Sequence, residues 1–121
     1  MDNLEFARTM QRRTMTFSVE VIRFYSKLPR TDEARIPGKQ FLRAGTAVGA
    51  NYRAVCRAKS KGDFISKMGT VVEEVDESIF WLDLMESASV CTNSPLVALR
   101  REANELLRLF STALKTAKGR S

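Results

Sequence analysis

The sequence predicts an all-α fold, an antiparallel up-down-up-down four-helix bundle that forms a single domain over residues 1–121. Apolar residues recur at steps of three, four and seven along four long stretches, which is the period of an amphipathic helix. Short runs of turn-forming residues separate these stretches, so that neighbouring helices should be antiparallel. No segment alternates polar and apolar residues over the length of a strand.

The first helix is predicted over about residues 4–28, opening at Asp2 or Asn3 and closing before Pro29. A second helix is predicted over about 36–58, because Pro37 suits the first turn, where its missing N–H costs nothing. The apolar faces expected for these two helices consist of Phe6, Met10, Phe17, Val21, Phe24 and Leu28, and of Phe41, Ala44, Val48, Asn51, Tyr52 and Val55.

A third helix is predicted over about 61–89, after the capping pattern that runs from Ser60 to Asp63. Asn93 and Pro95 then supply a cap and a first-turn proline for a fourth helix over about 95–117. Their apolar faces comprise Phe64, Met68, Val71, Val75, Ile79 and Leu82, and Leu96, Leu99, Ala103, Leu106, Phe110 and Leu114.

Two pairs of small residues have structural interpretations. Gly45 and Gly49 lie one turn apart on the second helix, a spacing that allows another helix to approach closely. Cys56 and Cys91 fall at opposite ends of the third helix, much further apart than the ~6 Å between Cα atoms that a disulfide requires. We therefore expect both cysteines to be reduced.

The composition argues against an enzyme. The chain has no histidine, and so lacks the commonest general base and metal ligand. No nucleophile motif, phosphate loop or dinucleotide-binding glycine pattern is present. Carboxylate-bridged metal sites in bundles draw ligands from several helices and include histidines, whereas Glu73, Glu74 and Glu77 share one helix. We expect no catalytic residue, no metal and no cofactor.

Neither a membrane span nor a secretory leader is apparent in the sequence. No apolar run approaches the ~20 residues that a bilayer crossing requires. The first residues, MDNLEFARTMQRR, contain no apolar core for a signal peptide. We expect a cytoplasmic protein with no membrane partner.

The charge is unevenly distributed. The formal net charge is +6, and residues 34–62 contain no acid. At 100° per residue, five basic side chains of the second helix project within an arc of ~80°, whereas the third helix is mostly acidic. The ridge could bind phosphates without sequence specificity, or it could pair with the acids within or between chains. The candidate nucleic-acid-binding residues are Arg35, Lys39, Arg43, Arg53, Arg57, Lys59 and Lys61.

Two groups of hydrophobic residues point away from the predicted core. One group lies on the third helix and the other on the first, and a monomer would leave both exposed to water. Two separate patches on different helices favour self-association, and a head-to-tail contact would close into a ring. The candidate oligomer interface consists of Met15, Val19, Ile22, Phe80, Trp81 and Leu84.

The central residues resemble a known family. The run FLRAGTAVGANYR at 41–53, the run RAKSKGDFISKMG at 57–69, and EEVDE at 73–77 with Trp81 and Leu82 after it are similar to the bacterial four helix bundle protein family. This is the 23S ribosomal RNA intervening-sequence protein family, a relative of the accessory variability determinant of diversity-generating retroelements. The resemblance implies an antiparallel four-helix protomer, commonly a homopentamer with a basic surface, and no established catalytic residues. It also implies an accessory role, since the retroelement relative binds nucleic acid and a reverse transcriptase.

The sequence thus leaves two functional hypotheses. The first is a non-enzymatic, ring-forming scaffold that binds RNA or DNA non-specifically through the basic ridge. The second is a protein–protein adaptor whose basic and acidic helices pair between protomers and leave no nucleic-acid site.

Overall fold

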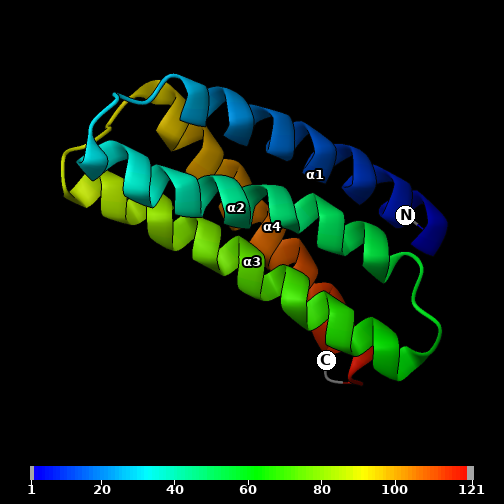
Figure 1. Ribbon diagram of the computed structural model, residues 1–121. Helices are drawn as coiled ribbons and strands as arrows, with labels where there is room; N and C mark the ends of the chain where they lie inside the picture. The colour runs from blue at the N-terminus through cyan, green and yellow to red at the C-terminus, as the bar shows by residue number, and fades with distance from the viewer. Residues whose placement is uncertain (1, 120–121) are drawn as a thin grey trace.

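The computed structural model describes residues 2–119 and confirms the all-α fold. Four helices make up the bundle: α1 (Asn3–Ser26), α2 (Asp32–Val55), α3 (Lys61–Ser87) and α4 (Ser94–Ala117). Figure 1 shows them running alternately up and down, with α1 and α2 side by side, α2 beside α3, and α4 behind. The start of α1 and the end of α4 consequently lie at the same end of the bundle.

Each helix begins at a residue whose side chain accepts a hydrogen bond from a backbone N–H in the first turn. Such caps satisfy donors that have no partner inside the helix. Three of these caps were predicted from the sequence, namely Asp2, Ser60 and Asn93. The four capping bonds join Asp2 to the amide of Glu5, Thr31 to that of Ala34, Ser60 to that of Asp63, and Asn93 to that of Leu96.

The predicted start of the second helix is wrong. Helix α2 begins at Asp32, not near residue 36, and Pro37 lies inside it, beyond the first turn. Thr31 caps the helix, and acids in the first turn favour a helix N-terminus. Pro37 leaves the carbonyl of Glu33 without its intrahelical donor. Glu33 is exposed, so that water can reach this carbonyl.

The core is the apolar interior expected from the helical periodicity. Phe24 and Phe41 meet edge to face with ring centroids 5.6 Å apart, and Tyr52 packs on Phe110 at 4.9 Å. Asn51 differs from the expectation, because it is only partly buried. The fully buried large side chains include Met10, Phe17, Phe41, Met68, Leu82, Leu96, Leu106 and Phe110.

Helices α1 and α2 approach closely at the two glycines, as predicted. A Cβ atom added at Gly45 would lie 2.8 Å from a methyl group of Val21. One added at Gly49 would lie 3.2 Å from the hydroxyl of Ser18 and 3.3 Å from the backbone oxygen of Thr14. Both cysteines are free, also as predicted.

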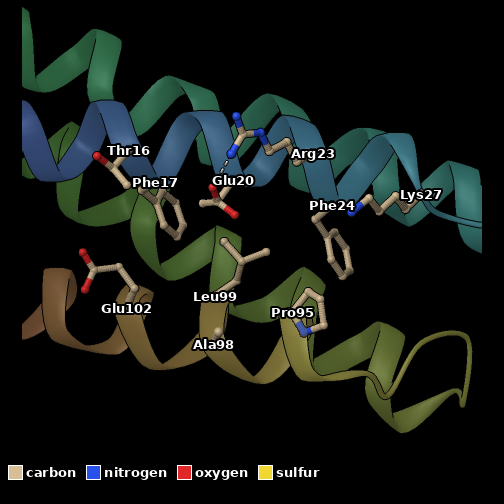
Figure 2. Close-up of a pocket in the computed structure, with 10 residues that line it drawn as sticks. All are labelled: Thr16, Phe17, Glu20, Arg23, Phe24, Lys27, Pro95, Ala98, Leu99 and Glu102. Atoms are coloured by element: carbon tan, nitrogen blue, oxygen red, sulfur yellow. Dashed lines mark hydrogen bonds and ion pairs between the residues drawn. The ribbon is translucent and has the colours of Figure 1, made fainter.

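The seam between α1 and α4 is the loosest contact between neighbouring helices. An ion pair bridges it, in which Arg13 donates to both carboxylate oxygens of Glu102 at 3.1 and 2.6 Å. On one side of this pair the seam opens into a cavity of about 500 Å³, lined by residues such as Phe17, Phe24 and Leu99 (Figure 2). Of the helices within residues 2–119, not one combines the length and the hydropathy that crossing a bilayer requires.

Candidate nucleic-acid interface

The predicted basic residues follow one side of the molecule from α2 into α3. Helix α2 ends at Val55, not near residue 58, so that Arg57 lies with Lys59 in the connection between these helices. Lys61 is the first residue of α3. Arg35 is partly buried and the other six are exposed. Six of the predicted side chains are therefore open to solvent, but the seven do not share the same environment.

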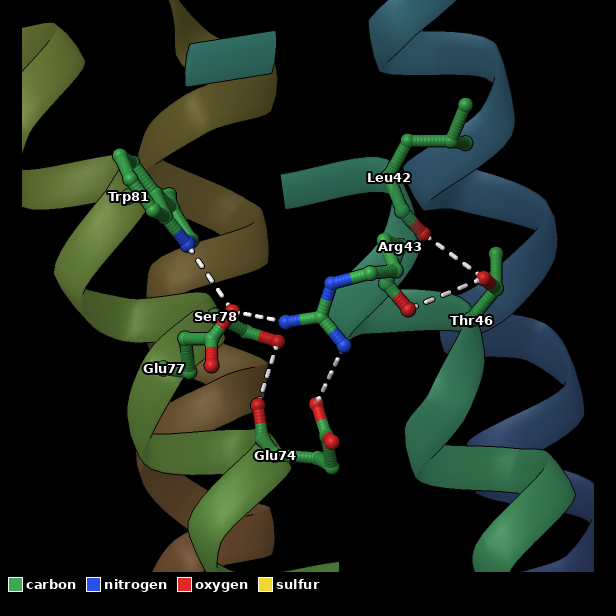
Figure 3. Close-up of polar contacts among 7 residues, drawn as sticks. All are labelled: Leu42, Arg43, Thr46, Glu74, Glu77, Ser78 and Trp81. Atoms are coloured by element: carbon green, nitrogen blue, oxygen red, sulfur yellow. Dashed lines mark hydrogen bonds and ion pairs between the residues drawn. The ribbon is translucent and has the colours of Figure 1, made fainter. Parts of the chain in front are cut away.

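Arg43, at the centre of the ridge, is paired with acids of the same chain. Its guanidinium donates to Glu74 at 3.5 Å and makes a short ion pair with Glu77. Glu77 in turn accepts a hydrogen bond from the indole nitrogen of Trp81 at 3.2 Å (Figure 3). These contacts tie α2 to α3 and neutralise Arg43. At this residue the ridge therefore pairs with acids of the same chain, which was one of the two interpretations of the basic residues.

Arg35 is held by an aromatic side chain. Its guanidinium donates to the hydroxyl of Tyr25 at 3.0 Å, and its central carbon lies 5.5 Å from the centre of that ring. This stacking fixes the direction of the arginine without neutralising its charge. Arg35 thus adds positive charge over the contact between α1 and α2.

Five of the seven predicted side chains are exposed and have no acid partner among residues 2–119. We refer to them as the α2 basic surface: Lys39, Arg53, Arg57, Lys59 and Lys61. Asp63 lies nearby, but its carboxylate accepts hydrogen bonds from the side chain of Lys67 and the backbone of Lys59. These bonds lower the pKa of Asp63 and keep the carboxylate bound to α3.

The structure adds two arginines of α1 that the sequence reasoning missed. Gly49 packs against Thr14, so Arg53, one turn further along antiparallel α2, is level with the part of α1 that carries Arg8 and Arg12. Both arginines are exposed. Their spacing of four residues on one helix face was a visible signal. They were missed because the predicted site rested on the acid-free stretch at 34–62, which does not include α1.

The candidate interface residues on α1 are exposed as predicted. Met15, Val19 and Ile22 are 63%, 37% and 52% exposed, at a spacing that places them on one face of the helix. We refer to them as the α1 apolar face.

On α3, two of the three predicted residues are well exposed. Phe80 is 54% exposed and Leu84 is 40% exposed, and we refer to this pair as the α3 apolar face. Trp81 differs, because it is partly buried against the core, with Phe80 packed edge-on to it at 4.9 Å. Its role in holding Glu77 was not visible from periodicity, which predicted an outward-facing side chain.

An exposed side chain of α2 extends the α3 apolar face. Ile36 is 65% exposed and lies seven residues before Arg43, whereas Leu84 lies seven residues after Glu77. Since Arg43 pairs with Glu77 and the two helices are antiparallel, Ile36 and Leu84 lie at the same level of the bundle. Ile36 was not predicted as part of an apolar face, because the second helix was expected to begin at this residue.

No cluster of three or more acidic, histidine or cysteine side chains that could hold a metal ion occurs within the described part of the chain. The strongest pKa shift is that of Tyr52, whose pKa is raised by burial in the core and by the neighbouring Cys56. Tyr52 is buried and packs on Phe110, so its position in the core is enough to account for the raised pKa.

Comparison with known proteins gives a consistent result. Among solved structures, the chain is similar to a protein of unknown function of the S23 ribosomal protein family from Bacteroides thetaiotaomicron. The two are 27% identical, the match covers 90% of this chain and 97% of the other, and the TM-score is 0.82. No curated protein matches the chain. The family described as "23S rRNA-intervening sequence protein" matches residues 8–112, which is most of the sequence, and the chain belongs to that family.

Proposed function

We propose that this protein is a non-enzymatic, homo-oligomeric scaffold that binds the nucleic-acid backbone through the α2 basic surface. The observation that carries the proposal is that the five cations of the α2 basic surface are exposed and have no acid partner in residues 2–119. They lie along a stretch, 34–62, that contains no acidic residue. An unpaired row of this kind raises the local positive potential and attracts polyanions.

The chemistry favours phosphate over base recognition. Arginine and lysine neutralise phosphates and release the counterions that surround a nucleic acid, which gives binding without sequence preference. Lys39 and Arg53 lie on α2, and the other three cations follow in the connection and at the start of α3. Arg8 and Arg12 add exposed positive charge on α1 at the level of Arg53. RNA is the first polyanion to test, because the descriptions of the family and of the solved relative mention 23S rRNA and a ribosomal protein. Such a role places the protein in the cytoplasm.

The proposal includes self-association. The α1 apolar face has basic neighbours, Arg8 and Arg12, whereas the α3 apolar face has acidic neighbours, Glu73 and Asp76. Unlike charges around two apolar faces favour a contact between the α1 face of one copy and the α3 face of the next. A repeated contact of this head-to-tail kind closes into a ring when the rotation allows it. The expected number of five protomers comes from the resemblance alone.

The test is a titration of labelled single-stranded RNA across a salt series, together with the mass in solution by light scattering. We expect the logarithm of the affinity to fall linearly with the logarithm of salt. The double variant Arg53→Gln/Arg57→Gln should bind more weakly and lower the salt slope by about 1.4–1.8, at 0.7–0.9 for each phosphate contact. The matched control is Arg101→Gln/Lys115→Gln on α4, which removes the same charge from exposed positions. Equal loss in both variants would refute a site on α2, and absence of binding at ~50 mM salt would refute nucleic-acid binding altogether.

The adaptor hypothesis has one observation in its favour. Arg43 already pairs with Glu74 and Glu77, so α3 acids can neutralise the ridge. In the adaptor, the remaining cations would pair with acids of a second copy or of a partner protein. The Arg53→Gln/Arg57→Gln variant distinguishes the two: loss of the oligomer supports the adaptor, whereas an intact oligomer with weaker RNA binding supports the scaffold.

A further inference from the structure

A second cavity lies on the other side of the Arg13–Glu102 pair along the seam between α1 and α4. It has a volume of about 810 Å³, within the range of small-molecule sites. It is open on one side and is bordered by the first turns of α1 and α3, the last turns of α2 and α4, and the connection between α2 and α3. Its walls are largely apolar and include Phe6, Phe64 and Leu109.

The charged side chains that line this cavity are positive: Lys59 and Arg108 contribute to the lining, and no aspartate or glutamate does. Arg108 is paired with Glu105. Lys59 has no ion pair among the described residues, although the carboxylate of Asp63 lies close by and accepts a hydrogen bond from the Lys59 backbone. The cavity at the other end of the seam differs, because Glu20 and Glu102 line it. A buried tyrosine of the wall, Tyr52, adds no negative charge, because burial raises its pKa.

The cavity is elongated along α4. Its lining residues on this helix extend from Arg108 to Ala117, a length of about 13 Å at 1.5 Å per residue. The small side chains of Ala113 and Ala117 leave room beside α4, so that a thin ligand can lie along the helix. A slot of this length with a cationic mouth suits a flexible hydrocarbon chain that carries one negative charge.

We propose that this cavity binds a medium-chain fatty carboxylate. The chain lies along α4 among Phe6, Phe64 and Leu109, and the carboxylate meets the ammonium group of Lys59 at the mouth. Each methylene buried in such a slot strengthens binding up to about fourfold. The proposal shares Lys59 with the α2 basic surface, but the apolar walls of the cavity take no part in nucleic-acid binding, so the dependence on chain length tests it separately.

Calorimetric titration with dodecanoate below its micelle concentration tests the proposal. We expect one dodecanoate per chain, and decanoate should bind up to about 15-fold more weakly for two fewer methylenes. Dodecyltrimethylammonium, which has the same chain and the opposite charge, should bind at least tenfold more weakly than dodecanoate. Equal binding of both amphiphiles would show non-specific adsorption and would overturn the proposal, as would no binding of dodecanoate.

The two cysteines report where the ligand lies. Cys56 is exposed and lines this cavity, whereas Cys91 lies beyond the other end of α3. Saturating dodecanoate should slow the reaction of Cys56 with iodoacetamide at least tenfold and leave the rate at Cys91 unchanged. Equal protection of both thiols would place the ligand elsewhere and would contradict the proposed site.

Substitutions complete the test. Ala113→Trp fills the slot and should abolish dodecanoate binding, whereas Ala98→Trp, in the lining of the other cavity on the same helix, should not. Lys59→Gln should weaken the binding of dodecanoate and should not weaken the binding of dodecyltrimethylammonium, because the substitution removes a charge that repels the cation. If Ala113→Trp does not fold, the Lys59→Gln comparison decides. Wild-type affinity for dodecanoate in Lys59→Gln would overturn the assignment of the carboxylate to Lys59.

Discussion

Arg43 of α2 forms an ion pair with Glu77 of α3, so the arginine at the centre of the basic stretch is neutralised by its own chain. Glu77 also accepts the indole N–H of Trp81, and Glu74 contacts the same guanidinium (Figure 3). Arg43 therefore acts mainly as a link between two helices. The cations on either side of it, Lys39 and Arg53, carry the exposed charge.

The first prediction follows from this difference between two arginines of the same helix. Arg53→Gln should weaken binding of RNA and lower the salt slope by about 0.7–0.9, the value for one phosphate contact. Arg43→Gln removes the same formal charge but should change the slope less, because Glu74 and Glu77 already offset that charge. Fluorescence anisotropy with labelled RNA over a range of salt concentrations measures both slopes. Equal decreases would show that Arg43 leaves its acid partners to bind phosphate.

The second prediction concerns the close contact of α1 with α2. A methyl group at Gly45 would lie 2.8 Å from buried Val21, and overpacking of this kind costs about 1–3 kcal/mol. The higher helix propensity of alanine offsets about 1 kcal/mol of this cost. Gly45→Ala should therefore lower the free energy of unfolding by up to about 2 kcal/mol. Gly69→Ala on α3 is the control, because nothing lies within 4 Å of its added carbon. Gly69→Ala should raise the free energy of unfolding, measured with urea, by up to about 1 kcal/mol.

The sequence predicted this part of the fold well because local rules determine it. Apolar periodicity identified the buried faces, and the G-x-x-x-G spacing identified the close approach at Gly45 and Gly49. The start of α2 was missed because Pro37 is a stronger signal in a sequence than the cap at Thr31. In the structure the cap determines the start, and one lost hydrogen bond at an exposed carbonyl is tolerated.

The candidate site was only partly predictable. The absence of acids from 34–62 identified the basic surface. The sequence of one helix does not show which of its cations meets an acid on another helix. Arg43 and Lys39 look equivalent in the sequence, and only the packing of α2 on α3 separates them. The cavity beside Lys59 was invisible to periodicity, because it arises where α1 and α4 fail to pack closely.

The third prediction concerns alkaline pH. Burial raises the pKa of Tyr52 above its ordinary value of 10.0. A group whose pKa is raised by folding stabilises the fold fully below its unfolded pKa, and this contribution is lost as the pH rises through the folded value. Above pH ~10 the unfolded chain releases the proton more readily, at about 1.4 kcal/mol for each pH unit. Urea unfolding at pH 8 and pH 11 should show a smaller loss of stability in Tyr52→Phe than in the wild type. The same loss in both proteins would contradict the assignment to Tyr52.

The fourth prediction tests the ion pair that bridges α1 and α4. Arg13 and Glu102 are each about one third exposed, at 33% of their side-chain surface, so solvent screens their attraction. A double-mutant cycle with Arg13→Met and Glu102→Gln should give a coupling energy of about 0.5–1 kcal/mol. High salt should reduce it, since screening weakens surface pairs. A coupling energy of zero would show that the seam is held by apolar contacts such as those of Leu99 alone.

The fifth prediction concerns the two apolar faces. Ile22→Ser on α1 and Phe80→Ser on α3 should each reduce the oligomer to a monomer, because either change weakens one side of a head-to-tail contact. Val97→Ser on α4 is the control, since Val97 is also exposed, at 38%, but lies on neither face. Light scattering of the separate variants gives the masses.

Mixing the two variants then distinguishes the kind of contact. A Phe80→Ser chain keeps its α1 face and an Ile22→Ser chain keeps its α3 face, so a head-to-tail contact lets the mixture form a heterodimer and nothing larger. A two-fold contact between α3 faces would instead leave Ile22→Ser as a dimer by itself. Unlike charges around the two faces, with Arg12 beside one and Asp76 beside the other, favour the heterodimer. An Ile22→Ser dimer would therefore refute the ring, because a two-fold contact closes on itself after two copies.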